Sequence, residues 1–138
     1  VATLPSGDPT TFDVAANARV QRWLPHSVVL PRATCVITHG GMGATQKALA
    51  AGVPVVAVPF GRDQHEVARR VEVSGAGVRL PSSKLTPRRL REAVDQARNQ
   101  RRAAQHLAHE LASAGGATRA AEEIEALTGS QSPSHTPP

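Results

Sequence analysis

The stretch THGGMGATQKALAAGVPVVAVPFGRDQ, residues 38–64, decides the fold of this chain. Glycine occupies positions 40, 41 and 43, and two residues separate Gly40 from the apolar run at residues 35–37. Helix-forming residues then continue without a breaker as far as Gly52. Continuous apolar runs are typical of strands buried on both faces of a parallel sheet. The stretch therefore predicts a strand over 34–38, a glycine turn, a helix over 44–51 and a second strand over 53–59.

Strand and helix patterns continue to alternate outward from this stretch. A further helix begins at Thr86-Pro87, because Thr is a favoured N-cap and Pro a favoured first helical residue. The remaining expected elements are strands over 1–4, 20–23 and 78–80, and helices over 26–33, 63–74 and 117–127. Strands that alternate with helices pair in parallel, so the predicted fold class is α/β, a Rossmann-like parallel sheet with flanking helices.

Length and composition fit one partial domain. The chain has 138 residues, enough to bury a core on folding. We expect this domain to cover residues 1–128 and the polar, Pro-rich residues 129–138 to form a disordered tail. The chain starts at Val1, without methionine and already within an expected strand, so we expect a fragment. Cys35, the only cysteine, excludes an internal disulfide, favours a cytoplasmic location and is expected to be a small buried hydrophobe.

The charge pattern favours a solvated surface over a polyanion-binding one. The formal net charge is +5, and aromatic residues make up 2% of the chain. Nucleic-acid-binding modules combine basic residues with stacking aromatics, so this class is disfavoured. Much of the basic excess lies in one expected helical region, whose arginines we expect to face water: Arg88, Arg89, Arg91, Arg98, Arg101 and Arg102. No run approaches the roughly 20 apolar residues that span a bilayer, so no membrane span is expected.

The glycine turn has two interpretations. A helix amino terminus offers unpaired N–H groups and a partial positive charge, and glycine lets a phosphate approach the backbone closely. Under that interpretation Gly40, Gly41 and Gly43 supply backbone, and His39 and Thr45 flank it with side-chain donors. Alternatively, the turn needs glycine only for its geometry. The turn by itself does not separate the two.

Two other motifs follow the ends of expected strands. Trp23, in RWLPH, stands where open α/β sheets bind ligands, and a flat indole there can stack on a nucleobase. A single Trp is also a common core residue. Asp63 and Gln64, in PFGRDQ, offer a carboxylate and an amide, which suit sugar hydroxyls. Asp63 is equally suited to cap the next helix.

These motifs, in this order, resemble those of the UDP-glycosyltransferase superfamily, which has the GT-B fold, and especially bacterial enzymes that glycosylate macrolides and other small lipophilic acceptors. The resemblance is to the donor-binding signature of the carboxyl-terminal domain, over about residues 20–80. The matching segments are Trp23-Leu24-Pro25-His26, the block from His39 to Thr45, Gly52-Val53-Pro54 and Asp63-Gln64.

The resemblance implies a role for each matched position. Trp23 stacks on the base of a nucleotide sugar, and the segment around His26 hydrogen-bonds the edge of that base. Asp63 and Gln64 bind hydroxyls of the transferred hexose. The diphosphate is bound by a set of residues in the turn: His39, Gly40, Gly41, Met42, Gly43 and Thr45. No metal or other cofactor is implied, because the helix end and a histidine offset the charge of the leaving diphosphate.

Two positions depart from the family pattern. Ala44 stands where relatives usually carry a hydroxyl residue, so one phosphate contact is missing. Lys47 stands where many relatives carry a Glu that accepts hydrogen bonds from the ribose. An ammonium cannot accept a hydrogen bond, so either the ribose is bound differently or the donor is a deoxynucleotide sugar. Both UDP and dTDP donors stay open, with UDP ahead on family frequency.

The catalytic part of such an enzyme is not expected in these residues. In the family, the acceptor pocket and the catalytic His, oriented by an Asp, lie in an amino-terminal domain. His65 is a poor substitute, because it lies on the donor side. We therefore expect no catalytic residue here and an isolated chain that is inactive. The alternatives are a non-catalytic nucleotide-binding module, a nucleic-acid-binding domain and a nucleotide-sugar epimerase, the last disfavoured by Trp23 and Asp63-Gln64.

Overall fold

The computed structural model describes residues 1–129, which form five strands, six α-helices and three short 3₁₀ helices. In chain order these are β1 (Ala2–Thr3), η1 (Pro9–Thr11), β2 (Val20–Gln21), α1 (His26–Val29), η2 (Leu30–Arg32), β3 (Val36–Thr38), α2 (Met42–Ala50), β4 (Val55–Ala57), α3 (Gln64–Val73), β5 (Gly77–Arg79), η3 (Ser82–Lys84), α4 (Pro87–Asn99), α5 (Arg101–Ser113) and α6 (Gly116–Gly129). The predicted tail, apart from Gly129, lies outside the described residues, and the domain boundary at 128 stays a prediction.

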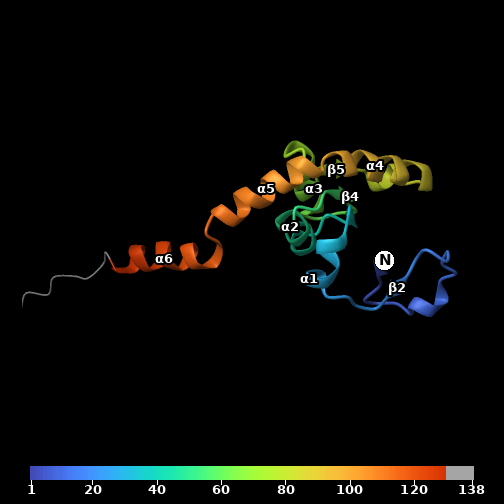
Figure 1. Cartoon of the computed structure of the whole chain (residues 1–138), viewed down its shortest axis with the longest axis horizontal. Coiled ribbons are helices and arrows are strands. Elements are labelled where there is room, and N and C mark those ends of the chain that lie inside the picture. The colour runs from blue at the N-terminus through green and yellow to red at the C-terminus, as the bar shows by residue number, and fades with distance from the viewer. Residues whose placement is uncertain (130–138) are drawn as a thin grey trace, which may run out of the picture.

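All strand pairs are parallel, which confirms the predicted α/β class with flanking helices. One sheet has the order β3-β4-β5, with Ile37 beside Val56 and Val56 beside Val78. The other consists of β1 and β2 alone. In Figure 1 this blue amino-terminal segment lies to one side of the green sheet and is joined to it through α1. The strands are shorter than predicted, and they form two sheets.

The core lies on both faces of the β3-β4-β5 sheet. Alternate residues of β4 face opposite sides, as the two-residue period of a strand requires. Val55 and Ala57 pack with α2, α3 and α5, whereas Val56 and Val58 pack with α4. All four of these side chains are buried. The sheet is therefore the middle of three layers. Because both faces of its central strand are buried, the sequence of that strand is an uninterrupted apolar run.

The long helical region after Thr86 is divided at Gln100, where the sequence has neither Gly nor Pro. The side chain of Thr86 caps α4 by accepting a hydrogen bond from the backbone N–H of Arg89 at 3.2 Å. Ala93 and Ala97 of α4 pack on one face of the sheet, and Ala104 of α5 packs on the other. Because the two helices pack on opposite faces, the chain has to pass around the edge of the sheet between them. Local helix propensity does not predict a break of this kind.

Two expectations about side-chain environment are settled by burial. The six arginines of the helical region are exposed, as predicted. The expectation of a buried Cys35 is wrong in degree: the residue is only half-buried against the cluster beneath α4, because it precedes β3, an edge strand of the sheet. This partial burial raises the pKa of its thiol. None of the helices within residues 1–129 combines the length and apolar character needed to cross a membrane. Figure 1 shows α6 leading away from the layered body. The side chains of Ile124 and Leu127 in this helix are exposed.

Replacing Gly77 with Ala is expected to lower the free energy of unfolding by about 1–3 kcal/mol, because β5 has no room for a side chain there. A Cβ at this position would overlap the carbonyl of Val55 and the side chain of Val71. Urea unfolding measures the change. The control is Gly61→Ala, since a Cβ at Gly61 meets no atom within 4 Å. Equal urea midpoints for the two variants would contradict this packing.

Candidate functional site

The three glycines of the turn after β3 have different surroundings. Gly40 has φ +85°, and a Cβ there would lie 3.0 Å from the backbone oxygen of Gln64. A Cβ on Gly41 would overlap the imidazole of His39. A Cβ on Gly43 would meet no atom within 4 Å. Gly40 is therefore required by backbone conformation and packing, whereas nothing in the described chain requires glycine at position 43.

The amino terminus of α2 carries unused backbone donors. The helix begins at Met42, and its N-cap, Gly41, has no side chain to accept from the first turn. The first amide to bond within the helix is that of Thr45, which donates to the Gly41 oxygen at 3.1 Å. The N–H groups of Met42, Gly43 and Ala44 precede that bond, and together with the helix dipole they favour an anion at this end.

His39 and Thr45 flank this end of α2 in different ways. His39 is exposed, and its ring lies beside Gly41. Thr45 is 2% exposed, and its Oγ1 has no hydrogen-bond partner among the described residues. Burying a hydroxyl without a partner is unfavourable, so this oxygen marks a place where a partner is missing.

The loop after β4 lies against the glycine turn and presents the two predicted sugar-binding residues. The Oε1 of Gln64 accepts hydrogen bonds from the N–H groups of Phe60 at 2.9 Å and Gly61 at 3.2 Å. Its amide nitrogen is therefore the group left to bind a ligand, and it can only donate. Asp63 occupies the N-cap position of α3, but its carboxylate makes no capping hydrogen bond, so capping does not explain this residue.

Trp23 and His26 line a separate hollow of about 750 Å³ beside α1 and α2. Trp23 is 72% exposed, so it is not a core residue. Lys47, one of the two positions that depart from the family pattern, lines the same hollow, as do Ala50 and Ala51. The hollow thus combines a flat aromatic face, an imidazole and an ammonium, and its size is in the range of small-molecule sites.

The structure brings the predicted residues together as two groups. The glycine turn and the Asp63-Gln64 loop meet where the neighbouring strands β3 and β4 end, and Trp23 and His26 meet beside Lys47. Sequence reasoning missed two residues of the loop. Phe60 is 66% exposed, and Arg62 has φ +56°, a strained conformation for a residue with a side chain. The signal available in the sequence was an aromatic residue directly before Gly61, in the same PFGRDQ motif that supplies Asp63 and Gln64.

Comparison with known proteins shows the family of this chain. Residues 1–127 match the family model described as "Erythromycin biosynthesis protein CIII-like, C-terminal domain". The chain belongs to this family. It is also 42% identical over 124 residues to the NDP-glycosyltransferase YjiC of Bacillus licheniformis, covering 87% of this chain and 31% of that protein. The predicted resemblance to the carboxyl-terminal domain of GT-B glycosyltransferases is thereby confirmed.

Solved structures of glycosyltransferases share the fold of this EryCIII-like domain. The calicheamicin glycosyltransferase CalG4 superposes with a TM-score of 0.81 at 35% identity, covering 93% of this chain and 34% of that one. The glycosyltransferase VinC, solved in complex with dTDP, has a TM-score of 0.64 at 32% identity, covering 71% of this chain and 26% of that one. The EryCIII-like chain thus spans about a third of the length of the relatives it matches.

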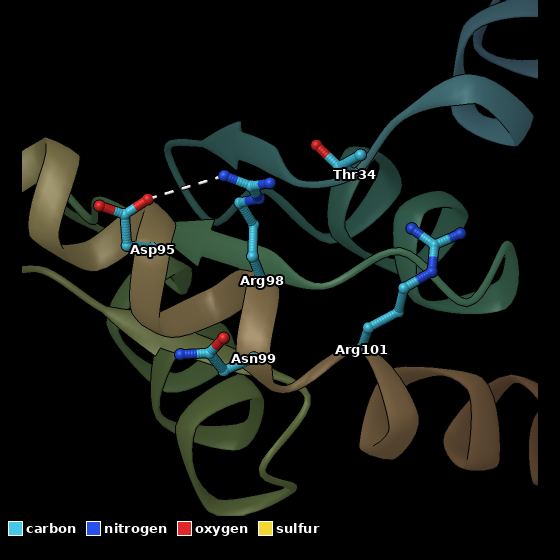
Figure 2. A pocket seen from close by; sticks show the side chains of 5 residues that line it. All are labelled: Thr34, Asp95, Arg98, Asn99 and Arg101. Atoms are coloured by element: carbon cyan, nitrogen blue, oxygen red, sulfur yellow. Dashed lines mark ion pairs between the residues drawn. The ribbon is translucent and has the colours of Figure 1, made fainter.

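A second hollow of about 420 Å³ lies at the opposite end of the sheet in this EryCIII-like domain. Thr34, just before β3, lines it together with Asp95, Arg98, Asn99 and Arg101, all shown in Figure 2. Arg98 pairs with Asp95 at 3.8 Å, and Arg101 donates to the backbone oxygen of Ala33 at 3.3 Å. Both guanidinium groups already have protein partners, so this hollow is the weaker anion site. No three potential metal ligands cluster within residues 1–129.

The two outer glycines of the turn are expected to respond oppositely to alanine. Gly40→Ala forces a side chain into the left-handed region against the Gln64 oxygen and should lower the free energy of unfolding by more than about 1 kcal/mol. Gly43→Ala should leave that free energy unchanged or raise it by up to about 1 kcal/mol, because Ala favours a helix. Urea unfolding distinguishes them. A Gly43→Ala variant as unstable as Gly40→Ala would show that position 43 is also structural.

Proposed function

We propose that the chain is the donor-binding part of a glycosyltransferase that transfers a hexose from a UDP or dTDP sugar. The observation that carries the proposal is the amino terminus of α2. There the N–H groups of Met42, Gly43 and Ala44 are uncapped, and Gly43 opens to free space. A diphosphate fits these donors, because it can approach the backbone where no Cβ intervenes. His39 supplies a further donor, and the buried Thr45 hydroxyl supplies one more if it turns toward the phosphate.

The remaining groups are assigned by their chemistry. The exposed face of Trp23 stacks on the nucleobase, and His26 beside it hydrogen-bonds the edge of the base. On the other side of the turn, the uncapped carboxylate of Asp63 accepts from sugar hydroxyls. The amide nitrogen of Gln64 donates to them, since its oxygen is held by Phe60 and Gly61. The donor thus lies along the carboxyl ends of the strands.

The reaction belongs to the complete enzyme. An acceptor hydroxyl attacks the anomeric carbon, the bond from that carbon to the diphosphate oxygen breaks with inversion, and the nucleoside diphosphate leaves with the electron pair. The hydroxyl proton passes to a base in an amino-terminal domain that also holds the small lipophilic acceptor. The helix end offsets the charge on the leaving group, so no metal or other cofactor is included in the proposal. A cytoplasmic location is part of the same proposal, on the single cysteine.

Intrinsic fluorescence tests donor binding directly, because Trp23 is the only Trp and the chain has no Tyr. Titration with UDP or dTDP should quench this fluorescence as the base stacks on the indole. Calorimetry should show binding that Gly43→Ala weakens by tenfold or more, about 1.4 kcal/mol, without loss of folding. Gly61→Ala is the matched control, since it adds the same methyl group away from the helix end. If neither nucleotide binds, or if Gly43→Ala binds normally, the proposal fails.

Lys47 should determine the choice between the two nucleotides. It lines the hollow beside Trp23 and cannot accept a hydrogen bond from the ribose 2′-hydroxyl that UDP has and dTDP lacks. The dTDP bound in VinC supports a deoxyribose donor here. Lys47→Glu should raise the affinity for UDP relative to dTDP by about tenfold or more, as expected for a hydrogen bond to a charged acceptor.

Lys47→Met is the matched control for this choice, because it removes the positive charge without adding an acceptor. Its ratio of UDP to dTDP affinity should stay at the value of the unmodified chain. The two ratios, measured by calorimetry, distinguish an acceptor effect from a charge effect. If the ratio of UDP to dTDP affinity is the same in Lys47→Glu and Lys47→Met, Lys47 does not determine which nucleotide binds.

A further inference from the structure

The loop between β4 and α3 is held in place by its own hydrogen bonds. The backbone N–H of Gln64 donates to the Gly61 oxygen at 3.3 Å, and the Gln64 side chain accepts from the amides of Phe60 and Gly61. Pro59, at the start of the loop, is fully buried. Residues 60–64 therefore follow a fixed path, and the conformation of Arg62 within this path is set by the fold.

Arg62 has an unfavourable backbone conformation in this loop. It is the only residue other than glycine with a positive φ, +56°, in the part of the chain that the structure describes. The left-handed region disfavours a residue with a Cβ, and strain of this kind is typical of functional sites. The side chain is exposed, and within residues 1–129 its guanidinium has no ion-pair or hydrogen-bond partner. No contact in the described chain explains an arginine at this strained position.

Arg62 is the single Lys or Arg in the two segments that meet at this edge of the sheet. These segments are residues 38–45 and 59–64, and they meet where Gly40 lies against the Gln64 oxygen. The next residue, Asp63, adds a negative charge to the same loop. A diphosphate at the amino terminus of α2 therefore has a carboxylate nearby, and Arg62 is the residue of these two segments whose permanent charge offsets it.

The position of Arg62 in the loop indicates which phosphate it meets. In the proposed donor arrangement the base stacks on Trp23 and the transferred hexose lies at Asp63. The hollow that contains Trp23 lies beside α1 and α2, whereas Arg62 directly precedes Asp63. The β-phosphate is joined to the hexose, so it is the phosphate closer to this loop. The guanidinium is thus on the sugar side of the diphosphate.

We propose that Arg62, the strained residue of this loop, binds the β-phosphate of the nucleotide sugar. This inference rests on the donor-binding function proposed for the chain. A guanidinium presents paired N–H groups that match two phosphate oxygens, and such charge-assisted hydrogen bonds are stronger than neutral ones. When the bond from the anomeric carbon to the β-phosphate oxygen breaks, that oxygen keeps the electron pair. Arg62 stabilises the negative charge that develops there.

Calorimetry with the 138-residue chain tests this contact by comparing nucleotides with and without a β-phosphate. UDP and dTDP carry this phosphate, and UMP and dTMP lack it. Arg62→Gln should weaken binding of the two diphosphates by about tenfold or more, because a charge-assisted contact is lost. Binding of the two monophosphates should stay unchanged. The matched control is Arg69→Gln, which removes an exposed arginine of α3 and should leave all four affinities unchanged.

Two further substitutions separate ligand binding from a structural role. Arg62→Gly removes the side chain from the left-handed position, so the urea midpoint should stay the same or rise. The same variant should lose diphosphate affinity as Arg62→Gln does. Arg62→Lys keeps a positive charge without the paired N–H groups, so its diphosphate affinity should lie between those of Arg62→Gln and the unmodified chain. A residue that serves only the fold would not give this combination.

The outcomes distinguish this inference from the function on which it rests. If the unmodified chain binds neither UDP nor dTDP, both fail. If it binds them, and Arg62→Gln and Arg62→Gly bind them as tightly, the donor site stands and Arg62 has no part in it. Equal weakening of monophosphates and diphosphates in Arg62→Gln would place Arg62 away from the β-phosphate and overturn the proposal. A lower urea midpoint for Arg62→Gly would assign the side chain a structural role and overturn it as well.

Discussion

The backbone of Gly40 lies against the carbonyl of Gln64, and the arrangement of the site depends on this contact. Between β3 and α2 the chain adopts a left-handed conformation at Gly40 and passes close to the start of α3. Glycine suits both requirements, because it has no Cβ. On the other side of the contact, the Gln64 side chain holds the Phe60 and Gly61 amides. The helix end and the loop that carries Asp63 are therefore fixed relative to each other before any ligand arrives.

This contact changes the meaning of the glycine cluster. In the sequence, three glycines look like one signal, for which geometry and phosphate binding are competing explanations. In the structure the two explanations apply to different positions. Gly40 meets the packing requirement, and Gly43 leaves space at the uncapped end of α2. The separation matters because only a glycine that the fold does not need is evidence for a ligand.

Local patterns predicted most of the fold and the candidate site. The apolar runs marked β3 and β4, Thr86-Pro87 marked the start of α4, and the order of motifs indicated the family. The break at Gln100 was missed, because it arises from α4 and α5 packing on opposite faces of the sheet. The sequence also did not predict that the Gln64 side chain can only donate hydrogen bonds to a ligand. That property arises because its oxygen already accepts from the backbone amides of Phe60 and Gly61. Both are tertiary effects without a local sequence signal.

Binding of a diphosphate at the amino end of α2 can be tested through the NMR chemical shifts of the backbone amides there. On titration with dTDP or UDP, we expect the largest shifts at the backbone amides of Met42, Gly43 and Ala44, with a further shift at the Trp23 indole N–H. Unchanged amides at this helix end, with the largest shifts at Arg98 and Arg101 instead, would place the nucleotide in the hollow at the opposite end of the sheet and rule out binding at α2.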